Sequence, residues 1–259
     1  KIVLGDEIVS VNGMAIDQSR RLILAGQEHR RHLFFVQVDP EEEIEVEYRR
    51  RQNSELQTVV LQAREAIPAE DVIEISARVI ESEGNRYGYI RYWNLMSVKT
   101  TELSRDVIEE QFDDCHMLIL DLRGRGGLIP VVLSMEKLIR RTDVPVIAVT
   151  DNLTRSAKEM LSWLIKDHPH VTVVGERTAG AVTGATMTQL PSGNGLMYPA
   201  LSSENLKGLT GDVILEGVGV EPDIQCDFQI PWCGGNDRLL EAAIETADEQ
   251  IEELLRTII

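Results

Sequence analysis

The sequence predicts an α/β fold with a mostly parallel sheet, preceded by a smaller β-rich module. From residue 80 onward, short apolar runs that are typical of buried strands alternate with helical patterns of about ten to fifteen residues. This alternation favours right-handed βαβ units, whose strands lie parallel in one sheet. Residues 3–66 carry shorter runs in which apolar and polar residues partly alternate, as in antiparallel strands.

The first module contains three strand patterns. Residues 3–13 end on Asn12 and Gly13, a dipeptide that favours a tight hairpin turn. Residues 43–48 alternate again, and residues 58–62 supply a further strand. Residues 67–79 contain a proline and several acidic side chains and are predicted to be a linker, so the second domain is expected to span residues 80–259.

The second domain is predicted to alternate strands and helices before it ends on a long helix. The amphipathic pattern from Asn236 onward places Leu, Ile and Ala on one stripe, which we expect to pack on the sheet. A partner-binding role for this helix is the alternative. The expected strands are 86–93, 117–120, 144–149 and 171–174, the helices are 101–112, 131–141 and 156–167, and a hairpin joins 185–190 to 195–198.

Composition excludes several function classes. The chain has 259 residues, of which 43% are hydrophobic, and no apolar run approaches the length of a membrane span. A formal net charge of −17 argues against binding nucleic acid or anionic membranes, because no basic face is expected that could neutralise phosphates. The chain starts within an apolar run at Lys1 and shows no secretory signal, so we expect it to be a segment of a longer protein.

The three cysteines show no metal-binding spacing and include no CxxC motif. Cys115 precedes a buried strand pattern and is expected to be an inert core thiol. Cys226 and Cys233 could pair across a short turn, which the sequence leaves open together with the redox compartment.

The most informative segment is residues 151–160, where an apolar strand leads through a polar turn into a helix that begins near Ser156. The first N–H groups of a helix have no partner within it, and the helix dipole adds positive potential there. A serine at this junction could therefore attack a carbonyl whose oxyanion the N–H groups stabilise. The alternative is that Ser156 or Thr154 only caps the helix.

Three further blocks accompany this segment: residues 116–127, a buried strand that runs into a glycine-rich turn, and residues 174–184 and 215–223. In order and spacing the four blocks resemble the C-terminal processing (tail-specific) serine proteases, especially their tricorn-like and interphotoreceptor-retinoid-binding-protein-like branch. The resemblance covers about residues 80 to 250 and implies a crotonase-like core of ββα units. It also implies that Ser156 is the nucleophile and that N–H groups of Ala157 and of Gly126 or Gly127 bind the oxyanion.

The first module resembles a PDZ domain over the segment from Gly5 to Gly13. PDZ domains bind peptide C-termini by adding a strand to a sheet edge. The first strand and the carboxylate-binding loop of such a domain would precede Lys1. We therefore describe residues 1–66 as a partial PDZ-like domain and do not expect it to capture tails by itself.

The general base departs from the better-known pattern. Many relatives use a Ser–Lys dyad, but Ala181 stands where that lysine is expected. One explanation is a substituted lysine. We favour the other, in which the chain follows the tricorn-like branch with its Ser-His-Ser-Glu tetrad and Glu216 is the tetrad glutamate that orients the histidine. In that branch the histidine and its neighbouring serine precede the PDZ domain, so the base is expected outside this chain.

The basic side chains within the chain are poor substitutes. His116 opens a core strand, while His168 and His170 follow the Ser156 helix at its far end, about 18 Å away at 1.5 Å per residue. His29 and His32 belong to the first module. Lys158 follows Ser156 on the same helix and is expected to face another way.

The sequence thus predicts a serine endopeptidase that cleaves polypeptides, which reach the active site through their unstructured C-terminal tails. Its expected partner is a polypeptide substrate, and neither nucleic-acid binding nor membrane insertion is expected. Homo-oligomerisation is left open, and no metal or organic cofactor is implied. The resemblance favours a periplasmic or envelope location, although a cytoplasmic one is also compatible. The alternatives are a catalytically silent binding or scaffold protein of the same fold, and a small-molecule or acyl-CoA enzyme with a similar core.

Overall fold

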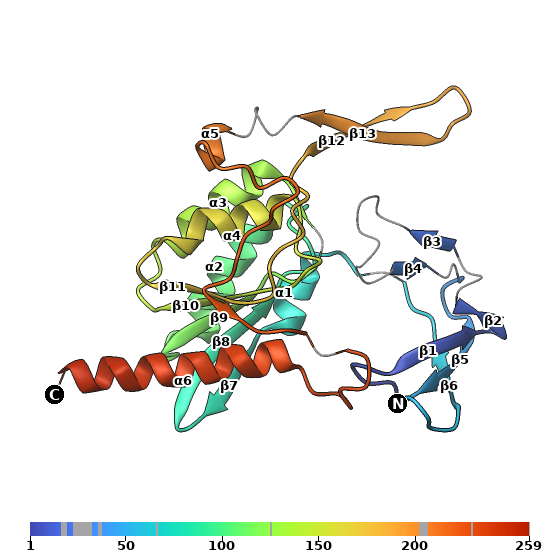
Figure 1. The fold of residues 1–259 in the computed structure, drawn as a ribbon, viewed down its shortest axis with the longest axis horizontal. Helices are drawn as coiled ribbons and strands as arrows, with labels where there is room; N and C mark the ends of the chain where they lie inside the picture. Colours follow the sequence, from blue (N-terminus) through green and yellow to red (C-terminus); the bar gives the residue numbers. More distant parts are fainter. Residues whose placement is uncertain are drawn as a thin grey trace. The chain divides into compact units, whose positions relative to one another are not determined.

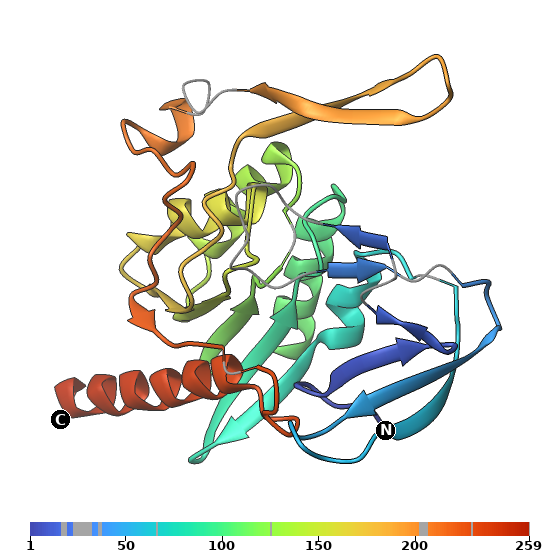
Figure 2. The ribbon, with the colours of Figure 1, turned by 45° about the vertical axis from the view of Figure 1, so that its right-hand side comes forward.

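The chain divides into two compact units, shown as a ribbon in Figure 1 and turned by 45° in Figure 2. Unit 1 comprises residues 1–67 and 228–238, and unit 2 comprises residues 68–227 and 239–259. The computed structural model describes residues 1–16, 20–22, 33–35, 38–65, 67–124, 126–201, 207–228 and 230–258.

Unit 1 contains a four-stranded antiparallel sheet in the order β2-β1-β5-β6. Asn12 and Gly13 form the β1–β2 turn, both with positive φ (49° and 71°), as a tight hairpin with the right-handed twist of its strands requires. The strands predicted at 43–48 and 58–62 are present. Whether the unit is a PDZ domain stays a prediction. The bounds are β1 Glu7–Val11, β2 Met14–Ala15, β5 Glu43–Arg49 and β6 Gln57–Gln62, and a separate pair joins β3 Arg20–Leu22 to β4 Leu33–Phe35.

Unit 2 is built on a six-stranded sheet in the order β14-β11-β10-β9-β8-β7. Strands β8, β9, β10, β11 and β14 run parallel, and only the edge strand β7 is antiparallel to its neighbour. The predicted α/β fold with a mostly parallel sheet is confirmed. The strands are β7 Arg78–Ser82, β8 Asn85–Arg91, β9 Met117–Asp121, β10 Val146–Thr150, β11 Val171–Gly175 and β14 Ile224–Gln225, and the helices are α1 Asp71–Ser76, α2 Thr100–Gln111, α3 Ile129–Ile139, α4 Ala157–Lys166, α5 Lys207–Thr210 and α6 Arg238–Ile258.

Helices cover both faces of this sheet, with α2, α3 and α4 on one side and α6 on the other (Figure 1). Leu118 and Leu120 of β9 belong to the core cluster beneath the first group of helices. Met117 and Ile119 alternate with them, lie outside that cluster and are equally buried, as expected of the opposite face. The central strands are therefore continuous apolar runs because neither face is solvated.

Polar contacts hold α6 on its face of the sheet. Asp248 accepts hydrogen bonds from the hydroxyls of Ser82 (2.7 Å) and Tyr87 (2.5 Å), which lie on β7 and β8. The first turns of α6 pack as predicted, with Leu239 and Ala243 buried. Leu254, near its C-terminal end, is half exposed, so the predicted apolar stripe is only partly covered.

The stretch predicted as a linker, residues 67–79, contains helix α1 and the start of β7. Ile73 is 1% exposed and belongs to the core cluster, so these residues form part of unit 2 instead of a free connection. Helix α1 is only six residues long, too short for its apolar spacing to stand out beside Pro68 and the neighbouring acids.

The hairpin predicted after β11 is present as β12 Gly184–Gln189 and β13 Gly195–Leu201. It extends away from the helices of unit 2 (Figure 2) and exposes Met187 and Met197. None of the helices in the described ranges combines the length and apolar character that crossing a membrane requires.

Candidate active site

The parallel strands of unit 2 place three loops at one edge of the sheet. Strands β8, β9 and β10 end at Arg91, Asp121 and Thr150, and because they run parallel their carboxyl ends lie together. In open parallel sheets this edge is where ligands bind. The glycine-rich turn follows β9 and the segment with Ser156 follows β10, so the topology brings both predicted motifs to this edge.

Ser156 occupies the N-cap position of α4 with φ 54° and ψ −127°. A positive φ is uncommon for a residue other than glycine and stores strain that the surrounding structure must hold. Its N–H donates to the carbonyl of Ala181 (3.0 Å), and its own carbonyl accepts from Met160 (3.0 Å). The side chain makes no capping hydrogen bond and is partly exposed.

The neighbouring hydroxyl also does not cap α4. Thr154 is buried, and its Oγ1 lies 3.0 Å from Asp151 Oδ1 and 3.2 Å from the carbonyl of Leu122. Asp151 Oδ1 also accepts the N–H of Gly124 (3.0 Å), which ties the two loops together. The interpretation of Ser156 or Thr154 as a simple helix cap therefore does not describe this junction.

The backbone of Gly126 lies directly against Ser156. A Cβ at position 126 would lie 2.6 Å from the Ser156 Cβ and 3.2 Å from its Oγ, so only glycine fits there. The turn is also held from its other side, because Gly126 accepts the N–H of Leu95 (3.0 Å) and Leu95 accepts the N–H of Leu128 (2.9 Å). Gly127 packs equally closely on Leu95.

Three N–H groups near this junction have no protein acceptor. Within the described residues, those of Gly126, Gly127 and Ala157 donate no hydrogen bond, whereas their neighbours Ser156 and Leu128 do. These are the groups that the sequence nominated as oxyanion donors. That these N–H groups converge on one point near the Ser156 Oγ stays a prediction.

Two carboxylates hold the segment that faces Ser156. Glu159 is buried and accepts the N–H groups of Gly180 (2.6 Å) and Ala181 (2.9 Å). Burial raises the pKa of Glu159, and the nearby charge of Glu216 acts in the same direction. Glu216 is exposed, and its Oε2 accepts the N–H of Val182 (2.8 Å). Glu216 is thus brought to the segment that contacts Ser156, whereas Glu159 was missed by sequence reasoning.

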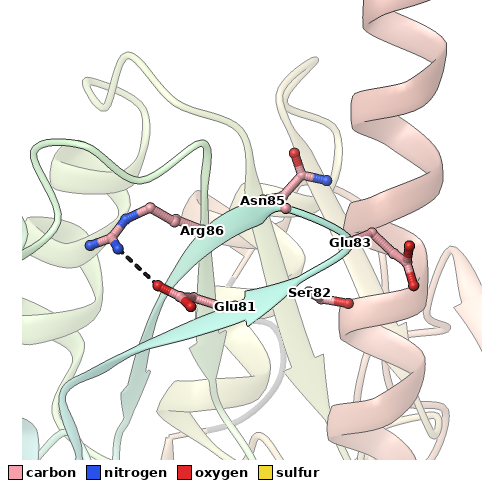
Figure 3. Close-up of a pocket in the computed structure, with 6 residues that line it drawn as sticks. Glu81, Ser82, Glu83, Asn85 and Arg86 are labelled. Atoms are coloured by element: carbon pink, nitrogen blue, oxygen red, sulfur yellow. Dashed lines mark hydrogen bonds and ion pairs between the residues drawn. The ribbon is translucent and has the colours of Figure 1, made fainter.

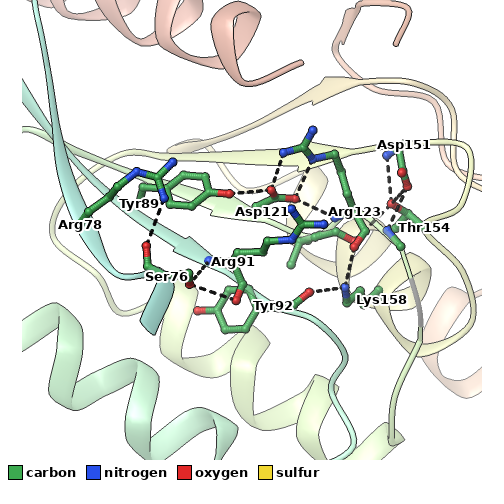
Figure 4. A network of polar contacts seen from close by, with 12 residues as sticks. Ser76, Arg78, Tyr89, Arg91, Tyr92, Asp121, Arg123, Asp151, Thr154 and Lys158 are labelled. Carbon is green, nitrogen blue, oxygen red and sulfur yellow. Dashed lines mark hydrogen bonds and ion pairs between the residues drawn. The ribbon is translucent and has the colours of Figure 1, made fainter. Parts of the chain in front are cut away.

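A buried ion pair stabilises the end of β9 (Figure 4). Arg123 donates to both oxygens of Asp121 (2.9 and 2.6 Å), and the hydroxyl of Tyr89 donates to Asp121 as well (2.7 Å). Burial acts to raise the pKa of Asp121, but the hydrogen bonds and charge of Arg123 outweigh it and lower the pKa to about 2. The pair fixes the backbone just before the glycine turn.

Lys158 is also buried, and its side chain points away from solvent into the loops at this edge (Figure 4). Its Nζ donates to the carbonyls of Tyr92, Trp93 (3.2 Å) and Arg123 (2.8 Å). Burial lowers the pKa of Lys158 to about 7, opposed by the charges of Asp121 and Asp151. No sequence signal distinguished this lysine from an exposed one on the same helix.

No described histidine lies at this junction. His116 precedes β9 and accepts the N–H of Arg86 (3.2 Å), at the opposite end of the strands. His168 and His170 follow the C-terminal end of α4, where their rings contact each other. His29 and His32 lie outside the described residues.

A pocket at the β7–β8 turn lies away from this site. It has a volume of about 320 Å³ and is lined by residues 81–86, where Arg86 pairs with Glu81 (Figure 3). It opens at the amino end of β8, not at the carboxyl ends that carry Ser156. Among the described residues, no group of histidine, cysteine and carboxylate side chains could hold a metal ion.

None of the three cysteines forms a disulfide in the structure. Cys115 is buried before β9, and burial raises the pKa of its thiol, which fits an inert core position. Cys226 and Cys233, whose pairing the sequence left open, are not joined by a disulfide.

Sequence comparison finds a family match over part of the chain. A sequence model described as peptidase family S41 matches residues 134–226, a stretch that includes Ser156, Ala181 and Glu216. S41 is a family of serine-type peptidases, which confirms the resemblance seen in the sequence.

Two curated relatives agree with this match. The chain is 27% identical to a Sulfurisphaera tokodaii protein named as a tricorn-like protease C-terminal subunit, over 68% of the chain and 22% of the relative. It is 26% identical to a carboxyl-terminal-processing protease of Picosynechococcus, over 45% of the chain and 34% of the relative. The chain therefore spans about a fifth to a third of the length of these relatives.

The fold also matches a solved protease structure. The photosystem II D1 C-terminal processing protease aligns with 91% of this chain and 69% of its own, with a TM-score of 0.51 and 20% identity. At this identity the likeness supports the fold and not the details of the site.

Proposed function

We propose that this chain carries the core of a serine endopeptidase that cleaves polypeptides, with Ser156 as its nucleophile. The observation that carries the proposal is the contact between Ser156 and Gly126, which places a strained, partly exposed serine against a glycine backbone at the carboxyl edge of a parallel sheet. A hydroxyl that caps no helix and a backbone that excludes side chains together suit attack on a carbonyl.

The oxyanion would be bound by backbone N–H groups. Ala157 begins α4, where the helix dipole favours negative charge, and Gly126 and Gly127 offer N–H groups without protein acceptors in the described part of the chain. Removing one such donor in a serine protease costs about 10²–10³ in kcat. The match of residues 134–226 to the S41 family model supports this assignment of roles.

Glu216 would orient a histidine supplied by another part of the protein. Its Oε2 is engaged by the N–H groups of Val182 and Thr183 (2.8 and 2.6 Å), which fixes the carboxylate beside the segment that contacts Ser156. Ala181 at the position of the dyad lysine favours this arrangement over a Ser–Lys dyad. The name of one relative, a carboxyl-terminal-processing protease, favours entry of substrate through a C-terminal tail.

Covalent labelling tests the proposal. A fluorophosphonate probe added to the full-length protein should modify Ser156, as read by peptide mass spectrometry, and Ser156→Ala should abolish the modification. In this reaction the Ser156 Oγ forms a bond to phosphorus, fluoride leaves, and the hydroxyl proton goes to the general base. A folded protein that is not labelled would favour the alternative, a silent family member that binds or scaffolds.

A further inference from the structure

Lys158 joins two loops that meet at the glycine turn. Its Nζ donates to the carbonyl of Arg123, which directly precedes the turn, and to those of Tyr92 and Trp93, which precede Leu95. The three donors of an ammonium group are thereby matched by three acceptors (Figure 4). All contacts of Lys158 lie in unit 2, so they belong to one compact body.

The two loops are themselves joined at the turn. Leu95 donates to the carbonyl of Gly126 (3.0 Å) and accepts the N–H of Leu128 (2.9 Å), which forms a parallel bridge with Gly127 between them. Lys158 therefore contacts both segments that form this bridge, the one before Leu95 and the one before Gly127. It does so from the same end of α4 that carries Ser156. Together with Asp151, which accepts the N–H of Gly124 (3.0 Å), Lys158 links the glycine turn to the segment that carries Ser156.

A cation at this place is costly. Lys158 is fully buried and lies in the first turn of α4, where the helix dipole disfavours positive charge. Within the described residues no carboxylate approaches its Nζ closely enough for an ion pair, and Asp121 and Asp151 act only through space. Methionine would fill the same volume without a buried charge. An energetically unfavourable buried charge is expected to be kept where the side chain has a role in the functional site.

We propose that Lys158 is a positioning residue that fixes the glycine turn against Ser156, and so sets the geometry of the oxyanion site. This inference rests on the proposed function of Ser156. We do not assign Lys158 as the general base, because its side chain is fully buried and its N–H groups are directed at three carbonyl oxygens.

The test compares Lys158→Met with Lys166→Met in the full-length protein. Lys166 is a matched control because it lies on the same helix and donates to the carbonyl of Glu221, but at the far end from Ser156. A misplacement of about 1 Å costs about 10²-fold in rate. We expect Lys158→Met to slow fluorophosphonate labelling of Ser156 and kcat for a p-nitrophenyl ester about 10- to 100-fold. KM should change less than about threefold, and Lys166→Met should leave both rates unchanged.

Hydrogen exchange provides a readout that needs no activity. Peptides covering residues 92–95 and 122–128 should exchange faster in Lys158→Met and not in Lys166→Met. Parent-like exchange and labelling in a folded Lys158→Met protein would overturn the inference. If Lys158→Met does not fold, Lys158→Gln, which keeps two of the three donors, should show intermediate exchange, and parent-like exchange there would equally overturn it. A parent protein that is not labelled at all would contradict the function of Ser156, whereas the exchange result would still decide the role of Lys158.

Discussion

Gly126 and Ser156 are in direct contact across two loops that are 30 residues apart in the chain (156 minus 126), with 2.6 Å between the Ser156 Cβ and the place of a Cβ at position 126. Non-bonded contacts of a Cβ atom are essentially never shorter than 3.0 Å, so a side chain at 126 would push the two loops apart. This contact couples the glycine turn to the candidate nucleophile.

Gly126→Ala should therefore lower the rate of Ser156 labelling by at least about 10²-fold while most of the fold remains, because the displaced N–H groups no longer meet the oxyanion. Circular dichroism checks that the fold remains, and mass spectrometry measures the rate of labelling. Gly208→Ala is the control, since a Cβ there meets no atom within 4 Å and its backbone is not left-handed. Equal labelling rates in both variants would show that the glycine turn takes no part in the reaction of Ser156.

Glu216→Gln should lower turnover of the full-length enzyme by about ten- to ten-thousand-fold if the carboxylate orients a basic histidine. The amide keeps a carbonyl oxygen for the N–H groups of Val182 and Thr183, so the unfolding temperature should change little. Glu221→Gln, an exposed carboxylate that pairs with Arg177, is the control. Turnover like that of the parent would show that Glu216 orients no catalytic histidine and only binds the backbone N–H groups.

Ala181→Lys tests the dyad explanation of the missing base. The carbonyl of Ala181 accepts the Ser156 N–H (3.0 Å), so a lysine side chain would start beside the candidate nucleophile. Under the tetrad interpretation, peptide cleavage by this chain should not rise, because the base comes from elsewhere. Cleavage measured with a fluorogenic peptide, with and without Ser156→Ala, checks this. Robust Ser156-dependent cleavage would establish the dyad and remove the tetrad.

Asp121→Asn should destabilise the fold by about 3–5 kcal/mol, because it leaves the buried Arg123 guanidinium without its counter-charge. Asp114→Asn breaks an exposed pair with Arg86 and should cost no more than about 1 kcal/mol. Urea unfolding measures both free energies.

The same pair predicts a pH dependence. The pKa of Asp121 is lowered from 3.8 to about 2 by Arg123 against the effect of burial, so its contribution to stability is complete above about pH 4 and is lost as the pH falls toward 2. The stability difference between the parent and Asp121→Asn should shrink over this range. A difference that stays constant from pH 5 to pH 2 would contradict the assigned ion pair.

The element types were largely predictable because they depend on local patterns. The apolar runs that became β9 and β10 and the helical spacing of α4 are short-range signals, and each appears within a few residues of its predicted place. Helix α1 was missed, since six residues carry too little periodicity to distinguish a helix from a linker. The burial of Ile73 was therefore invisible as well.

The sequence by itself determined the order of the central strands β8 to β11 and of helices α2, α3, α4 and α6, the hairpin turn at Asn12 and Gly13, and the nomination of Ser156 and the glycine turn. It did so because strand alternation, turn residues and helix starts are encoded in neighbouring residues. Only the tertiary structure decided that Gly126 touches Ser156 and that Lys158 and Glu159 are buried. These two side chains look like an ordinary solvated pair on a helix, but loops from distant parts of the chain close over this end of α4 and supply carbonyl and N–H partners. Burial of a charge depends on such long-range packing, which no local pattern contains.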